Sequence, residues 1–224
     1  MNDFATPGGE ARHEVTAGSV SEERRRRVSV GVSPVVDGRI VRPTLFADCH
    51  PTLCMDSREY SFEGETPTIN GYAHVSSDAT VVGDVRIEAN ANVWPGVVLR
   101  GDVGPVEVGR ESAIGDNATL HASTVGENVM VGHGAVLNDA TVEDGALVGF
   151  NSTVSEATIG SGSIVAMGTV VPPGYDVPPD SFVRGSPASV TPLSETTIDP
   201  EAVFEAFSSG DYANLAARHE ELFE

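Results

Sequence analysis

His121 and His133 are the residues of this chain best suited to chemistry, and both lie in the stretch from Gly96 to Asn138. They are the only histidines within the aliphatic repeat that runs through this stretch. A neutral imidazole coordinates metal ions such as zinc and also accepts protons as a general base. The two histidines are therefore candidate metal ligands or bases, and their use depends on the elements that position them.

Aliphatic residues recur about every sixth position on both sides of the two histidines. The expected inward positions, grouped in threes with steps of five, six and six residues, are Val82, Ile87, Val93; Leu99, Val108, Ile114; Leu120, Val125, Val131; Leu137, Val142, Val148; Val154, Ile159, Val165; and then Val171. The second group is longer because of an insertion within residues 101–106. A period of six fits neither an α-helix nor an alternating strand, and it is typical of a parallel β-helix whose coils have three short faces. Stacked coils then bury one continuous aliphatic core.

Equal positions in successive coils of such a fold stack about 4.8 Å apart. One outward column is predicted to contain Gly83, Arg100, His121, Asn138 and Ser155, and a second to contain Pro95, Asp116, His133, Phe150 and Met167. The two columns point outward from adjacent faces, so they diverge within one chain. A compact site that combines His133 with His121 and Asn138 needs His133 from a neighbouring copy, which a threefold trimer of prisms provides.

The composition excludes several classes of partner. The chain has 13 Lys plus Arg against 33 Asp plus Glu, for a formal net charge of −20, and every basic residue is an arginine. Nucleic acids and anionic membrane surfaces bind cationic faces, so neither is an expected partner. An acidic surface without lysine predicts a halophilic protein. No apolar run reaches about eighteen residues, which predicts a cytoplasmic protein.

The chain is expected to have three parts. Residues 1–54 lack a period and are rich in Gly, Pro and Ser, so they are predicted to be a disordered extension upstream of a native start at Met55, with a regulatory tail as the alternative. Residues 55–195 form the predicted β-helix, whose repeat ends near Val177, where prolines follow. Residues 196–224 are predicted to form two amphipathic helices along one face, beginning with an Asp199 N-cap and Pro200.

Four segments carry a resemblance to a known family: WPGVVLRGDVGPVEVG, IGDNATLH, VGHGAVLN and PPDSFVRGSPASV. Together they resemble the γ-class carbonic anhydrases, a family of left-handed parallel β-helix homotrimers built from hexapeptide repeats. The resemblance covers roughly residues 66 to 195. It implies an all-β, left-handed fold followed by C-terminal α-helices.

The resemblance also implies a zinc or iron ion at each subunit interface, held by three histidines, whose bound hydroxide attacks carbon dioxide to give bicarbonate. By position, His121 and His133 match two ligands, and Asn138 stands where the third histidine is expected. Arg100 and Asp102 match an interface ion pair, and Asp116 matches the acid of the motif before the first histidine. The resemblance therefore assigns Arg100, Asp102 and Asp116 to the catalytic site.

The chain departs from the family pattern at four places. Besides Asn138, it has Gly115 in place of a common glutamine, Val103 in place of an acidic residue, and only Ala122, Ser123 and Thr124 where an acidic loop is expected. A carboxamide is a poorer zinc ligand than imidazole, so an impaired site is expected. Two alternatives follow: a hexapeptide-repeat acyltransferase with His133 as its base, and a non-catalytic trimeric scaffold.

Overall fold

The computed structural model describes residues 58–208 and two short strands before them, β1 (Val35–Val36) and β2 (Arg39–Ile40). The chain divides into two compact units, Met1–Cys49 and His50–Glu224. In the first unit, β1 and β2 form an antiparallel pair. Apart from these strands, the predictions for residues 1–54 and for a native start at Met55 lie outside the described residues. No helix among the described residues is long and apolar enough to cross a membrane.

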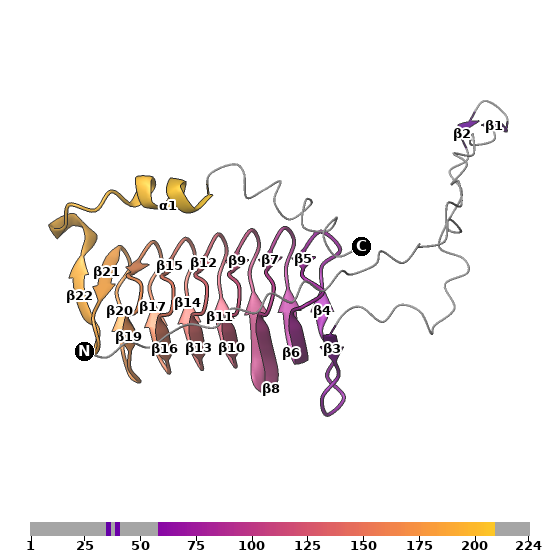
Figure 1. Ribbon diagram of the computed structural model, residues 1–224, viewed down its shortest axis with the longest axis horizontal. Coiled ribbons are helices and arrows are strands. Elements are labelled where there is room, and N and C mark those ends of the chain that lie inside the picture. Colours follow the sequence, from indigo (N-terminus) through magenta and orange to yellow (C-terminus); the bar gives the residue numbers. More distant parts are fainter. Residues whose placement is uncertain (1–34, 37–38, 41–57, 209–224) are drawn as a thin grey trace, which may run out of the picture. The chain divides into compact units, whose positions relative to one another are not determined.

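The second unit is a parallel β-helix whose coils each contribute short strands to three faces (Figure 1). The first face contains the N-terminal parts of β6 (Thr80–Ile87) and β8 (Val98–Val108), followed by β10 (Thr119–His121), β13 (Val136–Asn138), β16 (Thr153–Ser155) and β19 (Val170–Val171). The second face contains the C-terminal parts of β6 and β8, followed by β11 (Thr124–Val125), β14 (Thr141–Val142), β17 (Thr158–Ile159) and β20 (Asp176–Val177). The third face contains β5 (His74–Val75), β7 (Asn92–Val93), β9 (Ala113–Ile114), β12 (Met130–Val131), β15 (Leu147–Val148), β18 (Ile164–Val165), β21 (Ser181–Arg184) and β22 (Ser189–Pro192).

The two ends of the β-helix differ from its middle. Before the first full coil, β3 (Arg58–Tyr60) and β4 (Thr68–Ile69) pair in parallel with β6. At the other end, β20 and β21 still pair in parallel with β17 and β18, and Val177 and Val183 still point into the core. The predicted end of the repeat near Val177 is therefore too early. The antiparallel strand β22 then covers the edge of β21, so the ladder ends there.

The core is the predicted aliphatic column, with one correction. Leu99, Leu120 and Leu137, which follow one another on the first face, are each fully buried. Val82, however, is only half-buried, and Val81 is the inward residue, 1% exposed and paired with Leu99. The prediction is wrong here because the pairing of β6 with β8 shifts register between Gly83 and Val85, which a regular step of five does not anticipate.

The turns between faces use the left-handed backbone conformation that glycine and asparagine adopt most readily. The turn after the third face repeats this in successive coils, with φ between 54° and 72° at Gly96, Asn117, Gly134, Asn151 and Gly168. The prediction of Gly and Asn at the turns is confirmed at this corner. This repeated turn keeps the residues that precede it in register from coil to coil.

After β22, the 3-10 helix η1 (Leu193–Glu195) leads to helix α1 (Pro200–Ser208). Oδ1 of Asp199 accepts hydrogen bonds from the amides of Glu201, at 3.1 Å, and Ala202, at 3.3 Å, so the predicted N-cap is present. Val203 and Phe204 pack with Leu147 of β15 and Ile164 of β18. Helix α1 therefore packs against the third face, and the second predicted helix lies outside the described residues.

Candidate functional site

Arg100, His121 and Asn138 form a column on the first face, as the repeat predicts. His121 pairs with Arg100 on one side and with Asn138 on the other, because it ends β10 between β8 and β13. Successive side chains of a strand point to opposite faces, so each residue that follows a buried leucine points outward. The predicted column is wrong at one position, Gly83. Gly83 pairs with Gly101, and Val82 is the residue that pairs with Arg100.

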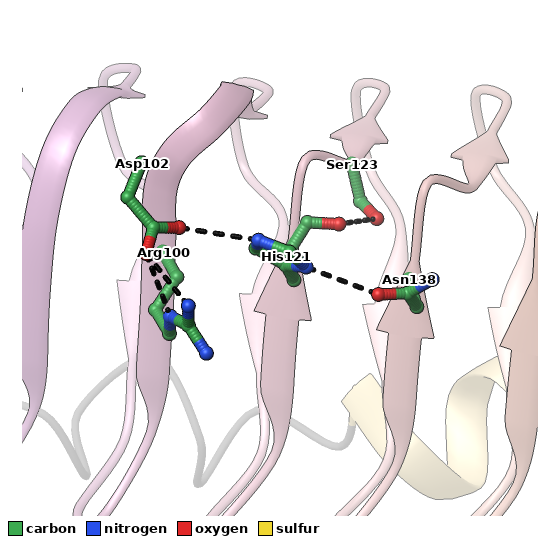
Figure 2. Close-up of polar contacts among 5 residues, drawn as sticks. All are labelled: Arg100, Asp102, His121, Ser123 and Asn138. Carbon is green, nitrogen blue, oxygen red and sulfur yellow. Dashed lines mark hydrogen bonds and ion pairs between the residues drawn. The ribbon is translucent and has the colours of Figure 1, made fainter.

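The His121 ring lies between two oxygen-bearing side chains (Figure 2). Its Nε2 is 3.1 Å from Oδ1 of Asp102, and its Nδ1 is 3.0 Å from Oδ1 of Asn138. The side chains of Asp102 and His121 are 18% and 25% exposed, so water reaches the pair only in part. These three residues form the polar cluster that we call the Asp102–His121–Asn138 chain.

Asp102 is held as a carboxylate by its neighbour Arg100. Nε and Nη2 of Arg100 donate to Oδ2 of Asp102, at 3.3 Å and 2.6 Å. These hydrogen bonds are the main reason that the pKa of Asp102 lies below its ordinary value, although desolvation of the carboxylate opposes them. An ionised carboxylate accepts hydrogen bonds only, so the facing Nε2 of His121 must carry the proton. The free lone pair of the neutral ring is then on Nδ1, which faces Asn138.

The backbone of His121 is fixed by a residue that the sequence analysis did not assign to the site. Oγ of Ser123 donates to the carbonyl of His121 at 2.8 Å (Figure 2). It also accepts from the amide of Ala140 at 3.1 Å. Ser123 is 1% exposed. Small polar residues recur at the inward turns, as Ser112 and Ser152 do. This recurrence is the feature of the sequence that could have identified Ser123.

His133 lies on a different face, and its column is also as predicted. It follows β12 on the third face, where its ring stacks on Phe150 with 5.0 Å between centroids. Its Nδ1 accepts a hydrogen bond from the amide of Asp116 at 2.9 Å, while Oδ2 of Asp116 lies 3.1 Å from the same nitrogen. The amide contact needs an unprotonated Nδ1, and the carboxylate contact needs a protonated one. The well-aligned amide hydrogen bond assigns the lone pair to Nδ1 and the proton to Nε2.

One chain therefore brings His121 and Asn138 together but leaves His133 apart. Among residues 58–208, no group of three or more His, Cys, Asp or Glu side chains is placed to hold a metal ion. Arg100 and Asp102 pair within the chain, at 2.6 Å, and their predicted contact across an interface is not tested by a single copy.

The donor atoms of His121 and Asn138 fit two neighbouring ligands of one cation. With Nε2 protonated, Nδ1 and Oδ1 of Asn138 present lone pairs to each other across 3.0 Å. In the neutral ring this contact is repulsive unless a cation is bound by both atoms or the carboxamide turns its NH₂ group toward the ring, whereas in the doubly protonated ring Nδ1–H donates to Oδ1. At a tetrahedral site, metal–ligand bonds of about 2.0 to 2.2 Å separate neighbouring ligand atoms by about 3.3 to 3.6 Å, so the two side chains would need to move apart by a few tenths of an ångström to bind one ion. The carboxylate on Nε2–H is the usual partner of a metal-bound histidine.

Comparisons with known proteins identify relatives of two kinds. The family described as the hexapeptide repeat of succinyl-transferase matches residues 140–173. A carbonic anhydrase of Geobacillus kaustophilus (strain HTA426) is 39% identical over 64 residues, which are 29% of this chain and 35% of the relative. The mitochondrial gamma carbonic anhydrase 1 of Arabidopsis thaliana is 41% identical over 59 residues, 26% of this chain and 22% of the relative. The matches thus span about a third or less of these relatives.

A solved structure matches most of this chain. The crystal structure of a hexapeptide transferase family protein from Anaplasma phagocytophilum superposes with a TM-score of 0.66 and is 30% identical in sequence. The match covers 72% of this chain and 97% of that protein. It therefore extends over nearly the whole of the solved chain.

Proposed function

This chain belongs to the hexapeptide-repeat family of left-handed parallel β-helix proteins, and we propose that it is a γ-carbonic-anhydrase-like enzyme that hydrates carbon dioxide reversibly. The site lies between copies of the chain in a homotrimer. Support comes from the relatives named carbonic anhydrases and from the column that places His121 beside Asn138. The observation that carries the proposal is the Asp102–His121–Asn138 chain.

In this proposal, Nδ1 of His121 and Oδ1 of Asn138 hold a zinc or iron ion together with His133 of a second copy. A bound ion of this kind lowers the pKa of its water to about 7 and so supplies hydroxide at neutral pH. Replacing one imidazole by a carboxamide weakens metal binding, so metal affinity and activity are expected to be lower than with three histidines.

The chain's own charged residues position the ligands. Arg100 keeps Asp102 ionised, and Asp102 accepts the Nε2 proton of His121, which directs the lone pair of Nδ1 toward the shared site. Asp116 has the corresponding place beside His133: if Nε2 of His133 is the ligand, Nδ1–H donates to Oδ2 of Asp116, which already lies 3.1 Å away. With Nε2 as a ligand, Asp116 would hold the proton of Nδ1 with its carboxylate, in place of the present contact with its amide.

The test is the rate of carbon dioxide hydration, followed by stopped flow with a pH indicator. We expect the parent protein to exceed the buffer rate, and His121→Ala and Asn138→Leu to fall to that rate. His74→Gln removes a histidine from the third face and should leave the rate unchanged. A parent rate equal to the buffer rate, with metal supplied, would contradict the proposal.

A second function, acyl transfer, is favoured by the same tautomer. A histidine whose Nε2–H is held by a carboxylate has a basic Nδ1, and such a base can take the proton of an acceptor hydroxyl or amine without any metal. His121 meets this description better than His133, whose Nδ1 already accepts the Asp116 amide. Saturable binding of acetyl-coenzyme A by metal-free protein would select this function. A folded trimer that neither holds metal nor binds an acyl donor would instead be a scaffold.

A further inference from the structure

A largely apolar cavity of about 430 Å³ lies on the third face, away from the Asp102–His121–Asn138 chain. Strands β7, β9, β12 and β15 form its floor, and Phe204 of α1 contributes to its wall. We propose that this cavity binds a small organic cation, an amine that carries an aromatic ring. Its volume is within the range of about 300 to 1,000 Å³ found for small-molecule sites in proteins.

The apolar part of the cavity suits a flat ring. Trp94, Phe150 and Phe204 line it, together with the aliphatic side chains of Met130 and Leu147. Trp94 is 7% exposed, so the cavity is bordered by a ring that the fold holds in place. Aromatic walls attract both ligand rings and organic cations, through stacking and cation–π contacts respectively.

The polar part of the cavity determines the charge of the ligand. Asn90, Asn92 and Asn128 supply carboxamides, and Glu111 supplies a carboxylate. No Lys or Arg is among the described residues that line the cavity. A carboxylate in such a lining favours an ammonium group and disfavours carboxylates and phosphates. The lining therefore selects an amine and argues against the phosphates of an acyl-carrier cofactor at this position.

This inference does not use His121, Asn138 or a metal. His133 also lines the cavity and belongs to the proposed metal site. No variant at this position therefore enters the test. The competing occupant is the segment that follows α1, residues 209–224.

Trp94 makes the test direct, because it is the single tryptophan of the chain and lines the cavity. We would titrate the full-length protein with phenethylamine and follow Trp94 emission. The control titration would use 3-phenylpropionate, which has a similar shape and the opposite charge. The expected result is a saturable change with the amine and a much weaker one with the carboxylate.

Three variants assign the signal to this cavity. Glu111→Gln should weaken phenethylamine binding by about fivefold, the scale of one partly exposed charge contact. Glu127→Gln removes the same charge from a residue outside the lining and should not change binding. Ala113→Leu places a larger side chain on the cavity floor and should abolish binding.

Three results would overturn the inference. If neither compound changes Trp94 emission saturably, the cavity is closed to ligands, as it would be if residues 209–224 occupied it. If both compounds bind equally, or if Glu111→Gln has no effect, the cavity has no preference for a cation. The thermal melting curve of each variant would confirm that it is folded before its titration is interpreted.

Discussion

His121 contacts an oxygen atom on each side of its ring, and the charge state of one neighbour decides which ring nitrogen can do chemistry. Asp102 is ionised because Arg100 donates two hydrogen bonds to it, and this requires a proton on Nε2 of His121. The nitrogen left with a lone pair, Nδ1, is the one that faces Asn138. The proposed metal site and the alternative base both depend on this tautomer.

Nitrogen-15 NMR of protein labelled at histidine tests the tautomer. At neutral pH and without metal, we expect His121 to show a protonated Nε2 and an unprotonated Nδ1. Asp102→Asn should remove this preference, because a carboxamide can donate to Nε2 as well as accept from it. A protonated Nδ1 in the parent protein would contradict the assignment.

The pH dependence of stability follows from the lowered pKa of Asp102. The folded-state pKa lies below the ordinary value of 3.8, so Asp102 stabilises the fold above that value, and this contribution is lost as the pH falls through the folded-state pKa. Urea unfolding of the parent and of Asp102→Asn should therefore differ most at neutral pH. The difference in free energy of unfolding should shrink below pH 3.8. A difference that grows in acid would be inconsistent with this assignment.

At the level of elements, the period of the sequence was enough to predict the faces, the inward residues and the pairing of His121 with Arg100 and Asn138. It failed at Val82, because the shifted pairing of β6 and β8 has no counterpart in a regular repeat. The approach of Asp102 to His121 was also beyond prediction. Asp102 lies in the insertion of residues 101–106, and a period does not specify how inserted residues fold.

Buried serines bridge successive coils, and one of them supports the site. Ser123→Ala would leave the amide of Ala140 without its partner and would remove one of two hydrogen bonds to the carbonyl of His121, which also accepts from the amide of Asp139. We therefore expect a loss of about 1 to 3 kcal/mol in the free energy of unfolding. Ser112→Ala is the matched control, because Ser112 makes the same kind of bridge between Gly126 and Val129. Denaturant unfolding should show similar losses for both variants.

The two serine variants should differ in their effect on His121. Only Ser123→Ala should shift the NMR signals of the His121 ring, since only Ser123 bonds to the backbone of that residue. Equal shifts in both variants would mean that the change reports general loosening of the β-helix and not support of the site.

At the scale of the whole molecule, charge is the dominant feature of the sequence. A net charge of −20 means that the folded chain repels itself, and dissolved salt screens that repulsion. We expect the melting temperature to rise by several degrees as sodium chloride increases from about 0.01 to 0.3 M, the range over which screening changes most. Differential scanning calorimetry would measure it, and a melting temperature that is flat or falling with salt would argue against the halophilic prediction.

The most direct test of the proposed function is the metal content per subunit, measured by elemental analysis of protein purified without chelator or affinity tag. The account predicts about one zinc or iron ion per subunit in the parent, tighter retention in Asn138→His and loss in His121→Ala. If the parent holds no metal while Asn138→His does, Asn138 has disabled the metal site, and the central claim is contradicted.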